Sequence, residues 1–400
     1  MNVLDRFLKY VSFPTASCED SESVPSTERQ TVLAHFIADE LSSMGLSDVG
    51  VDGCGYVYAV LPATPGMENA EPIGFVSHMD TSPDAPGENI KAKKILYRGG
   101  DIDLGERVMH VSDFPVLSKY EGRELIVTDG STLLGADDKA GVAEIVGMCE
   151  YFVTHPEAAH CTVYICFTPD EEIGRGADHF DYDRFGAKVA YTVDGGELGE
   201  IEYENFNAAA AVVKVHGVNI HPGSAKNKMK NAALLAAEFI NRLPAAETPA
   251  HTEGYEGFYH VSDICANETE ATVAMIIRDH DREKFEKRKD FVKRLCEYLN
   301  GVYGDGTFEA FVSDSYYNMK EKIAPHMELI ERAKEAMKQA GAEPLIVPIR
   351  GGTDGARLSW EGNIPCPNLS TGGVNFHSVY EFIPADALDT MRDVLVNLAQ

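Results

Sequence analysis

The feature that most constrains the fold is a regular alternation of strand-like and helix-like segments that is interrupted once. Over the first ~200 residues, short apolar runs alternate with segments of helical spacing, and such alternation predicts an α/β domain with a mostly parallel sheet. The expected strands are 56–61, 73–77, 162–168 and 189–193, and the expected helices are 3–11, 28–44 and 140–153. The pattern resumes after residue 317 with helices over 326–340 and 384–399.

The interruption predicts a second, smaller domain inside the first. Its expected elements are strand 208–217, helix 227–242, strands 257–266 and 269–279, helix 282–298 and strand 307–317. This βαββαβ order is the ferredoxin-like arrangement. A chain of 400 residues also exceeds a comfortable single core. We therefore expect residues 1–205 and 317–400 to form one α/β domain, with a mixed sheet and helices on both faces, and residues 206–316 to form the insertion.

Charge and cysteine usage narrow the function classes. A net charge of −29 argues against nucleic acid and anionic membranes as partners, because both require basic patches. No stretch approaches the ~18 apolar residues of a membrane span, and the first 13 residues are too short and too charged for a signal peptide. The eight cysteines are scattered without a C-x-x-C pair, which predicts reduced thiols in a cytoplasmic protein.

Five potential metal ligands each follow an apolar run or a glycine turn. Imidazole nitrogen and carboxylate oxygen are the ligands that Zn²⁺ prefers after thiolate. In an open α/β sheet, ligands bind beyond the carboxyl ends of the strands, so we expect these side chains to converge there. Two ions sharing one carboxylate can polarise a carbonyl and lower the pKa of water, which predicts a hydrolase. The five residues are His78, Asp137, Glu172, Asp194 and His377.

Two neighbours of these residues have candidate supporting roles. Asp80 lies two residues after His78, on the same face of the strand end, and is placed to orient its ring. Of the adjacent acids Glu171 and Glu172, one can bind metal while the other serves as a general base. Each motif also has a structural explanation when it is taken singly. Asp137 or its neighbour Asp138 can cap the following helix, and the adjacent glutamates can form an acidic surface turn.

In combination, the motifs resemble the M20 family of metallopeptidases over essentially the whole chain, and within it the aminopeptidases that act on tripeptides. No expected ligand is substituted. The strings that carry the resemblance are "SHMDTSPD", "TDGSTLLGADDKAG", "FTPDEEIG", "YTVDGGELGEIEYENFNAA", "HPGSAK", "EGYEGFYH", "SDSYYNMKEK", "PIRGGTDGA" and "PCPNLSTGG".

The resemblance implies two zinc ions per subunit and assigns a role to each residue. His78 and Asp194 would hold one ion, Glu172 and His377 the other, and Asp137 would bridge them. Asp80 would orient His78, and Glu171 would be the general base. The resemblance also implies a cis peptide between Asp137 and Asp138, and it makes the inserted domain a lid that can mediate a homodimer.

The substrate and the residues that read its length are a further hypothesis. The carboxylate of a tripeptide lies roughly 7 Å beyond the first peptide bond, since the chain advances at most ~3.3–3.6 Å per residue. Arginine suits bidentate carboxylate capture, and Arg278 and Arg350 are the candidates. An ion pair of Arg278 with Asp279 or Asp281 is the structural alternative. His221 resembles the family histidine that helps to stabilise the oxyanion, although a loop histidine before proline is commonly structural.

The sequence therefore predicts a cytoplasmic metallo-aminopeptidase that releases the N-terminal residue from tripeptides during peptide catabolism. Another M20 hydrolase (a dipeptidase, carboxypeptidase or deacylase) would share the same ligands and is the alternative. A non-catalytic, metal-binding homologue is a third possibility. Such a protein should have lost Glu171 or a ligand, and all of them are present.

Overall fold

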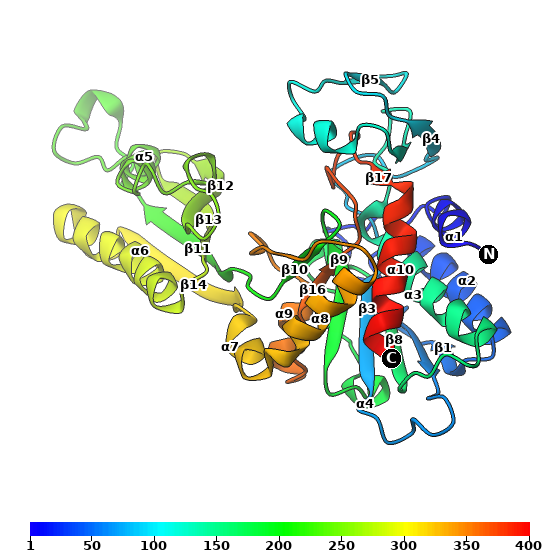
Figure 1. Cartoon of the computed structure of the whole chain (residues 1–400). Helices are drawn as coiled ribbons and strands as arrows, with labels where there is room; N and C mark the ends of the chain where they lie inside the picture. Colours follow the sequence, from blue (N-terminus) through cyan, green and yellow to red (C-terminus); the bar gives the residue numbers. More distant parts are fainter. The chain divides into compact units, whose positions relative to one another are not determined.

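The computed structural model describes residues 1–400, which form two compact units (Figure 1). The first unit comprises Met1–Tyr203, Glu321–Val347 and Thr353–Gln400, and the second comprises Glu204–Lys320 and Pro348–Gly352. The sequence did not predict that Pro348–Gly352 would belong to the second unit. None of the helices is both long and apolar enough to cross a lipid bilayer.

The first unit is built on an eight-stranded mixed sheet with the order β1-β2-β8-β3-β9-β16-β10-β15. These strands are β1 (Ser47–Val51), β2 (Val57–Leu61), β3 (Ile73–His78), β8 (Val163–Thr168), β9 (Ala190–Gly195), β10 (Glu200–Glu202), β15 (Leu345–Ile346) and β16 (Asn368–Ser370). The four central strands β8, β3, β9 and β16 run parallel, so their carboxyl ends meet at one edge of the sheet. This mixed sheet confirms the predicted fold class.

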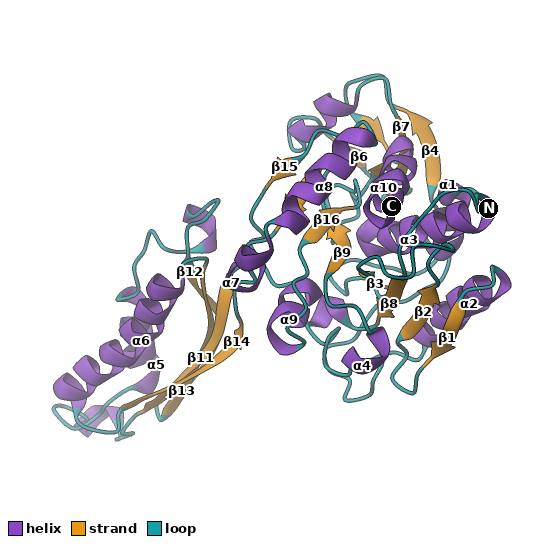
Figure 2. Cartoon of the chain, turned by 60° about the horizontal axis from the view of Figure 1, so that its bottom comes forward, coloured by secondary structure: helices purple, strands orange, loops and turns teal.

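Helices cover both faces of this sheet, as predicted (Figure 2). Helices α3, α8 and α10 lie on one side of the sheet, and α4 and α9 lie on the other. Helix α1 packs against α3 and α10, and helix α2 packs against β1 and β2. Helix α3 contacts β3 and β9 and is buried over most of its length. The helices of this unit are α1 (Val3–Tyr10), α2 (Arg29–Ser43), α3 (Ala136–Thr154), α4 (Tyr182–Phe185), α8 (Glu328–Gln339), α9 (Asp354–Glu361) and α10 (Ala385–Ala399).

A smaller three-stranded sheet belongs to the same unit and was not predicted. It has the order β17-β7-β4 and is antiparallel throughout. Its strands are β4 (Lys93–Leu96), β7 (Glu124–Val127) and β17 (Ile383–Pro384), and a hairpin of β5 (Ile102–Asp103) and β6 (Val108–Met109) lies between β4 and β7 in the sequence. Buried side chains from these segments, among them Tyr97, Leu117 and Phe382, form a separate small core.

The second unit is a four-stranded antiparallel sheet with two helices, in the predicted βαββαβ order. Its elements are β11 (Asn207–His216), α5 (Ala232–Asn241), β12 (Phe258–Ala266), β13 (Glu270–Asp279), α6 (Arg282–Tyr303) and β14 (Phe308–Tyr316), and the short helix α7 (Lys320–Ile323) follows. The strand order β12-β13-β11-β14 is that of a ferredoxin-like fold. Alternate residues of β11 and β13, including Val213, Val273 and Ile277, form a core with α5 and α6.

Two helix boundaries in the second unit differ from the prediction. Helix α5 begins at Ala232 rather than near residue 227, because the preceding residues pair as a β-bridge between Val218 and Lys230. The Asn231 side chain then caps the helix by accepting a hydrogen bond from the Leu234 N–H at 3.2 Å. Helix α6 continues to Tyr303, one turn beyond the predicted end, and stops at Gly304.

Candidate metal centre

All five candidate ligands of the sequence lie in one cluster in the first unit. His78 is the last residue of β3, Asp194 lies near the end of β9, and Glu172 lies in the turn that follows β8. Asp137 lies at the start of α3, and His377 lies in the loop between β16 and β17. The parallel strands deliver three of the five side chains to the same edge of the sheet, where ligand sites form in such folds.

Asp137 occupies the middle of the cluster. Its Oδ1 lies 2.9 Å from Nε2 of His78, and its Oδ2 lies 3.2 Å from Nε2 of His377. Burial alone would raise the pKa of Asp137, but the hydrogen bonds from His377 and His78 hold this pKa below its usual range. The two oxygens of one carboxylate therefore face two different imidazoles.

The remaining two ligands flank this arrangement on opposite sides. Asp194 Oδ1 lies 3.3 Å from Nε2 of His78. Glu172 Oε2 lies 2.8 Å from Nε2 of His377, and the other oxygen of Glu172 is buried without a hydrogen-bond partner. The cluster thus divides into one histidine–carboxylate pair on each side of Asp137.

The structure distinguishes Asp137 from its neighbour Asp138. One carboxylate oxygen of Asp138 accepts a hydrogen bond from the backbone N–H of His78 at 3.0 Å, and the other is buried without a partner. The peptide bond between the two aspartates is cis, as the resemblance implied. Asp138 therefore contacts the backbone of the strand end, whereas Asp137 faces the imidazoles.

Asp80 connects the His78 side of the cluster to the adjacent glutamates. Its Oδ1 lies 3.3 Å from Nδ1 of His78, and the Asp80 carbonyl oxygen lies 3.1 Å from the same nitrogen. The Asp80 carboxylate also accepts hydrogen bonds from the backbone N–H groups of Glu171 and Glu172, at 3.1 and 3.2 Å. One buried carboxylate therefore restrains both a ring and the turn that carries the two glutamates.

The electrostatics of the cluster favour bound cations. Burial and the nearby Asp137 raise the pKa of Glu172 to about 8, and burial raises that of Asp194 to about 6. Burial and Asp194 raise the pKa of Glu171 well above its ordinary value. Hydrogen bonds to Asp137 and Glu172 raise the pKa of His377 to about 11. Since carboxylates crowd together here in a buried site, a positive charge at the centre would stabilise their ionised forms.

Two supporting residues were missed by the sequence analysis. Asp170 precedes the glutamate pair, and its carboxylate accepts hydrogen bonds from Ser26 N and Oγ, at 2.6 and 2.5 Å, and from Gln30 Nε2 at 2.6 Å. Asp354, at the start of α9, accepts a hydrogen bond from Thr168 Oγ1 at 2.8 Å, and burial raises its pKa to about 7. Ser26 and Gln30 are distant in sequence from Asp170, and Thr168 is distant from Asp354, so no local sequence pattern indicates these contacts.

The three candidate substrate-binding residues belong to the second unit. The guanidinium of Arg350 is hydrogen-bonded within this unit. It donates to the carbonyl oxygens of Gly254, Glu256 and Thr252 at 2.7–3.3 Å. Arg278 differs, because its Nη1 is buried without a hydrogen-bond partner. His221 is exposed, and its Nδ1 accepts a hydrogen bond from the Gly223 N–H at 3.1 Å.

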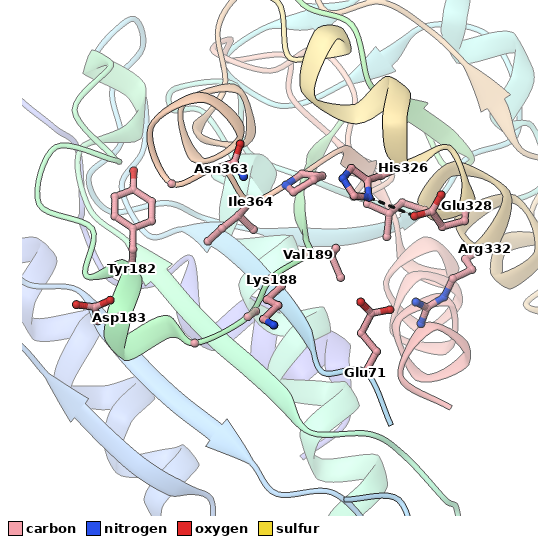
Figure 3. A pocket seen from close by; sticks show the side chains of 15 residues that line it. Glu71, Tyr182, Asp183, Lys188, Val189, His326, Glu328, Arg332, Asn363 and Ile364 are labelled. Atoms are coloured by element: carbon pink, nitrogen blue, oxygen red, sulfur yellow. Dashed lines mark hydrogen bonds and ion pairs between the residues drawn. The ribbon is translucent and has the colours of Figure 1, made fainter. Parts of the chain in front are cut away.

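A separate cavity of about 620 Å³ lies at the opposite end of the same sheet (Figure 3). Glu71 and Lys188, which line it, lie just before the starts of β3 and β9, whereas His78 and Asp194 lie at the carboxyl ends of these strands. Arg332 of α8 also lines this cavity, as do His326 and Glu328, whose side chains are hydrogen-bonded to each other at 3.3 Å. The cavity is therefore distinct from the ligand cluster and contributes no residue to it.

Comparison with known proteins gives consistent matches. A family profile described as the peptidase dimerisation domain matches residues 203–307. The peptidase T of Caldanaerobacter subterraneus subsp. tengcongensis is 52% identical over 402 residues, which cover 100% of this chain and 98% of that protein.

Solved structures share the fold. The aminopeptidase PepT of Bacillus cereus aligns with a TM-score of 0.78 at 24% identity, covering 100% of this chain and 97% of that one. The YxeP protein of Bacillus subtilis, described as a dinuclear metal-binding peptidase of the M20 family, aligns with a TM-score of 0.68 at 16% identity, covering 99% and 96%.

Proposed function

The chain belongs to the peptidase T family of M20 metallopeptidases, and from this membership we propose a two-metal aminopeptidase that acts on tripeptides. The chain is thus a hydrolase with a metal-binding site. The observation that carries the two-metal proposal is Asp137, whose two carboxylate oxygens face different histidines at 2.9 and 3.2 Å. A carboxylate in that position is suited to be a ligand that two metal ions share.

The residues present fit a pair of divalent ions, which we propose to be zinc. Nitrogen and oxygen donors are appropriate for Zn²⁺, and the buried, unpartnered oxygen of Glu172 is a donor that a metal would satisfy. His78 and Asp194 would hold one ion, and Glu172 and His377 would hold the other. Asp137 would contribute to both positions.

The chemistry then depends on Glu171. When bound, a pair of divalent ions polarises the scissile carbonyl and lowers the pKa of water. Glu171 accepts a proton from the attacking water at its carboxylate and donates that proton to the leaving nitrogen. Burial raises the pKa of Glu171 above its ordinary value, and a higher pKa makes the carboxylate a better acceptor of the proton from water. Asp80 holds the backbone N–H of Glu171 at 3.1 Å and so orients the base.

We propose that Arg278 reads the carboxylate end of the tripeptide. Its buried Nη1 has no partner, and a buried guanidinium nitrogen left unpaired is costly unless a ligand satisfies it. Arg350 is the weaker candidate, because four hydrogen bonds already join its guanidinium to residues 252–256. His221 remains a proposed contributor to oxyanion stabilisation.

The second unit also supports a proposal about assembly and location. Because the dimerisation profile matches residues 203–307, we propose that the protein forms a homodimer through this unit. The eight free thiols support a reducing, cytoplasmic environment.

The decisive experiment combines a Glu171→Gln variant with metal analysis. Glutamine keeps the size of the side chain but cannot accept the proton, so kcat for a tripeptide should fall by about 10²- to 10⁴-fold while the bound metal is retained. An N-acetylated tripeptide is the matched substrate control, because an aminopeptidase requires a free amine. Normal turnover by the variant would refute the role of Glu171. Equal cleavage of the acetylated peptide would instead favour a deacylase or carboxypeptidase.

A further inference from the structure

The loop that carries His377 is closed at its base, and several of its side chains contact other segments, among them His377, whose Nδ1 lies 3.3 Å from Oδ2 of Asp84. Two backbone hydrogen bonds between Val374 and Phe382, at 2.9 and 3.0 Å, close the loop. His377 lies at its tip with a left-handed backbone, at φ +59°. The side chain of Glu381, the last residue before the closure, is only 1% exposed and points away from solvent.

Glu381 attaches this loop to the loop that carries Asp137. One carboxylate oxygen of Glu381 accepts hydrogen bonds from the N–H groups of Leu134 and Gly135, at 2.7 and 2.8 Å. The other accepts a hydrogen bond from the Asp137 N–H at 3.1 Å. Three backbone N–H groups of the Asp137 loop therefore donate to one side chain, that of Glu381, on the His377 loop.

We propose that Glu381 is a positioning residue that sets the spacing between Asp137 and His377, and thereby the affinity of the metal position that these two ligands share. The inference rests on the proposed two-metal function and adds a residue that is not itself a ligand. Its physical basis is that hydrogen bonds to a carboxylate are roughly twice as strong as those between neutral groups. Residues that orient metal ligands typically influence metal affinity by 10- to 100-fold when they are changed.

A glutamine at this position would disrupt the attachment without removing a ligand. The amide of Glu381→Gln has only one oxygen, so it cannot accept all three hydrogen bonds, and its NH₂ group would face a backbone N–H. The loop of His377 would keep its backbone closure but lose part of its attachment to the loop of Asp137. Glu381→Asp retains both acceptor oxygens but is shorter by one methylene, so an intermediate effect is expected.

The test is a titration of the metal-free protein with Co²⁺ alone, followed by calorimetry and by the visible absorption of the bound ion. The unmodified protein should bind two equivalents. In Glu381→Gln, one equivalent should bind about 10- to 100-fold more weakly than in the unmodified protein and more weakly than the other. Glu144→Gln is the matched control, because Glu144 is also a buried glutamate yet has no hydrogen-bond partner. It should bind both equivalents normally.

The possible outcomes separate the two proposals. An unmodified protein that binds fewer than two ions would refute the two-metal function itself. Two normal equivalents in Glu381→Gln, or equal weakening of both, would overturn the positioning role while leaving that function intact. If Glu381→Gln does not fold, as judged by the thermal unfolding of the metal-free protein, Glu381→Asp decides: affinities equal to those of the unmodified protein would refute the inference.

Discussion

Replacing Glu144 by glutamine should change how the stability of the first unit depends on pH. Glu144 lies on α3, is fully buried, and neither of its carboxylate oxygens has a hydrogen-bond partner. Burial raises the pKa of this carboxyl well above its ordinary value, and no charged neighbour opposes the effect. Folding therefore favours the neutral form of Glu144.

The sign of the pH dependence follows from proton binding. Above the unfolded pKa of about 4.3 and below the raised folded pKa, the folded state binds one more proton at this position than the unfolded state does. The free energy of unfolding then falls as the pH rises, by about 1.4 kcal/mol per pH unit from this group. Between pH 5 and pH 7 the loss is about 2.7 kcal/mol for as long as the carboxyl stays protonated in the folded state.

Glutamine has no proton to lose, so the variant should lack this contribution. The difference in unfolding free energy between Glu144→Gln and the unmodified protein should grow in favour of the variant by about 1.4 kcal/mol per pH unit. The packing change and the buried amide add a constant that does not depend on pH. The slope of the difference therefore isolates the ionisation of Glu144.

The measurement is urea unfolding at several pH values between 5 and 7, with a chelator present so that metal binding does not contribute. The chain has one tryptophan, Trp360, which lies on α9 in the same unit as Glu144, so its fluorescence reports the relevant transition. Glu157→Gln, an equivalent change at an exposed position, serves as the control. A difference that stays constant across this pH range would refute the reasoning.

Four further substitutions test other parts of the structure. Gly141→Ala should lower the free energy of unfolding in urea by about 3 kcal/mol or more, because the new Cβ would lie 2.0 Å from the carbonyl oxygen of Val193. Alanine also has a higher helix propensity than glycine, but this gain of up to ~1 kcal/mol is smaller than the cost of the clash. Asp137→Ala should lose both metal ions by elemental analysis, and retention of two would contradict a shared ligand. Arg278→Ala should raise KM for a tripeptide by about 10- to 100-fold but leave the KM of its C-terminal amide unchanged. Arg350→Ala should lower thermal stability instead, since its hydrogen bonds lie within its own unit.

The central strands and the convergence of ligands could be predicted because both depend on local sequence. Apolar runs of strand length end directly before or at His78 and Asp194, and parallel strands bring their carboxyl ends to one edge. No register or long-range pairing needs to be known for that step. The adjacent glutamates could be found in the same way, because they follow the equally clear strand β8.

The short strands could not be predicted, for a physical reason. Strands β10, β15 and β17 contain two or three residues each, and β17 pairs with β7 across more than 250 positions of sequence. Such segments have no periodicity of their own, because two residues cannot establish an alternating pattern. Tertiary pairing alone makes them strands, and this pairing also places the small sheet that the sequence did not reveal.

The supporting residues of the site illustrate the same limit at the level of side chains. Glu381 is four residues from His377, but its hydrogen-bond donors are Leu134, Gly135 and Asp137, on a loop more than 240 positions away. Arg350 is a second example, because nothing in its sequence context distinguishes it from an arginine that binds a carboxylate. Only the fold shows that the carbonyl oxygens of Gly254 and Glu256 already accept its hydrogen bonds. A ligand is recognisable by its chemical type, whereas a positioning residue is defined by its partners. The candidate metal ligands were therefore accessible to sequence reasoning, whereas the residue proposed to set their spacing required coordinates.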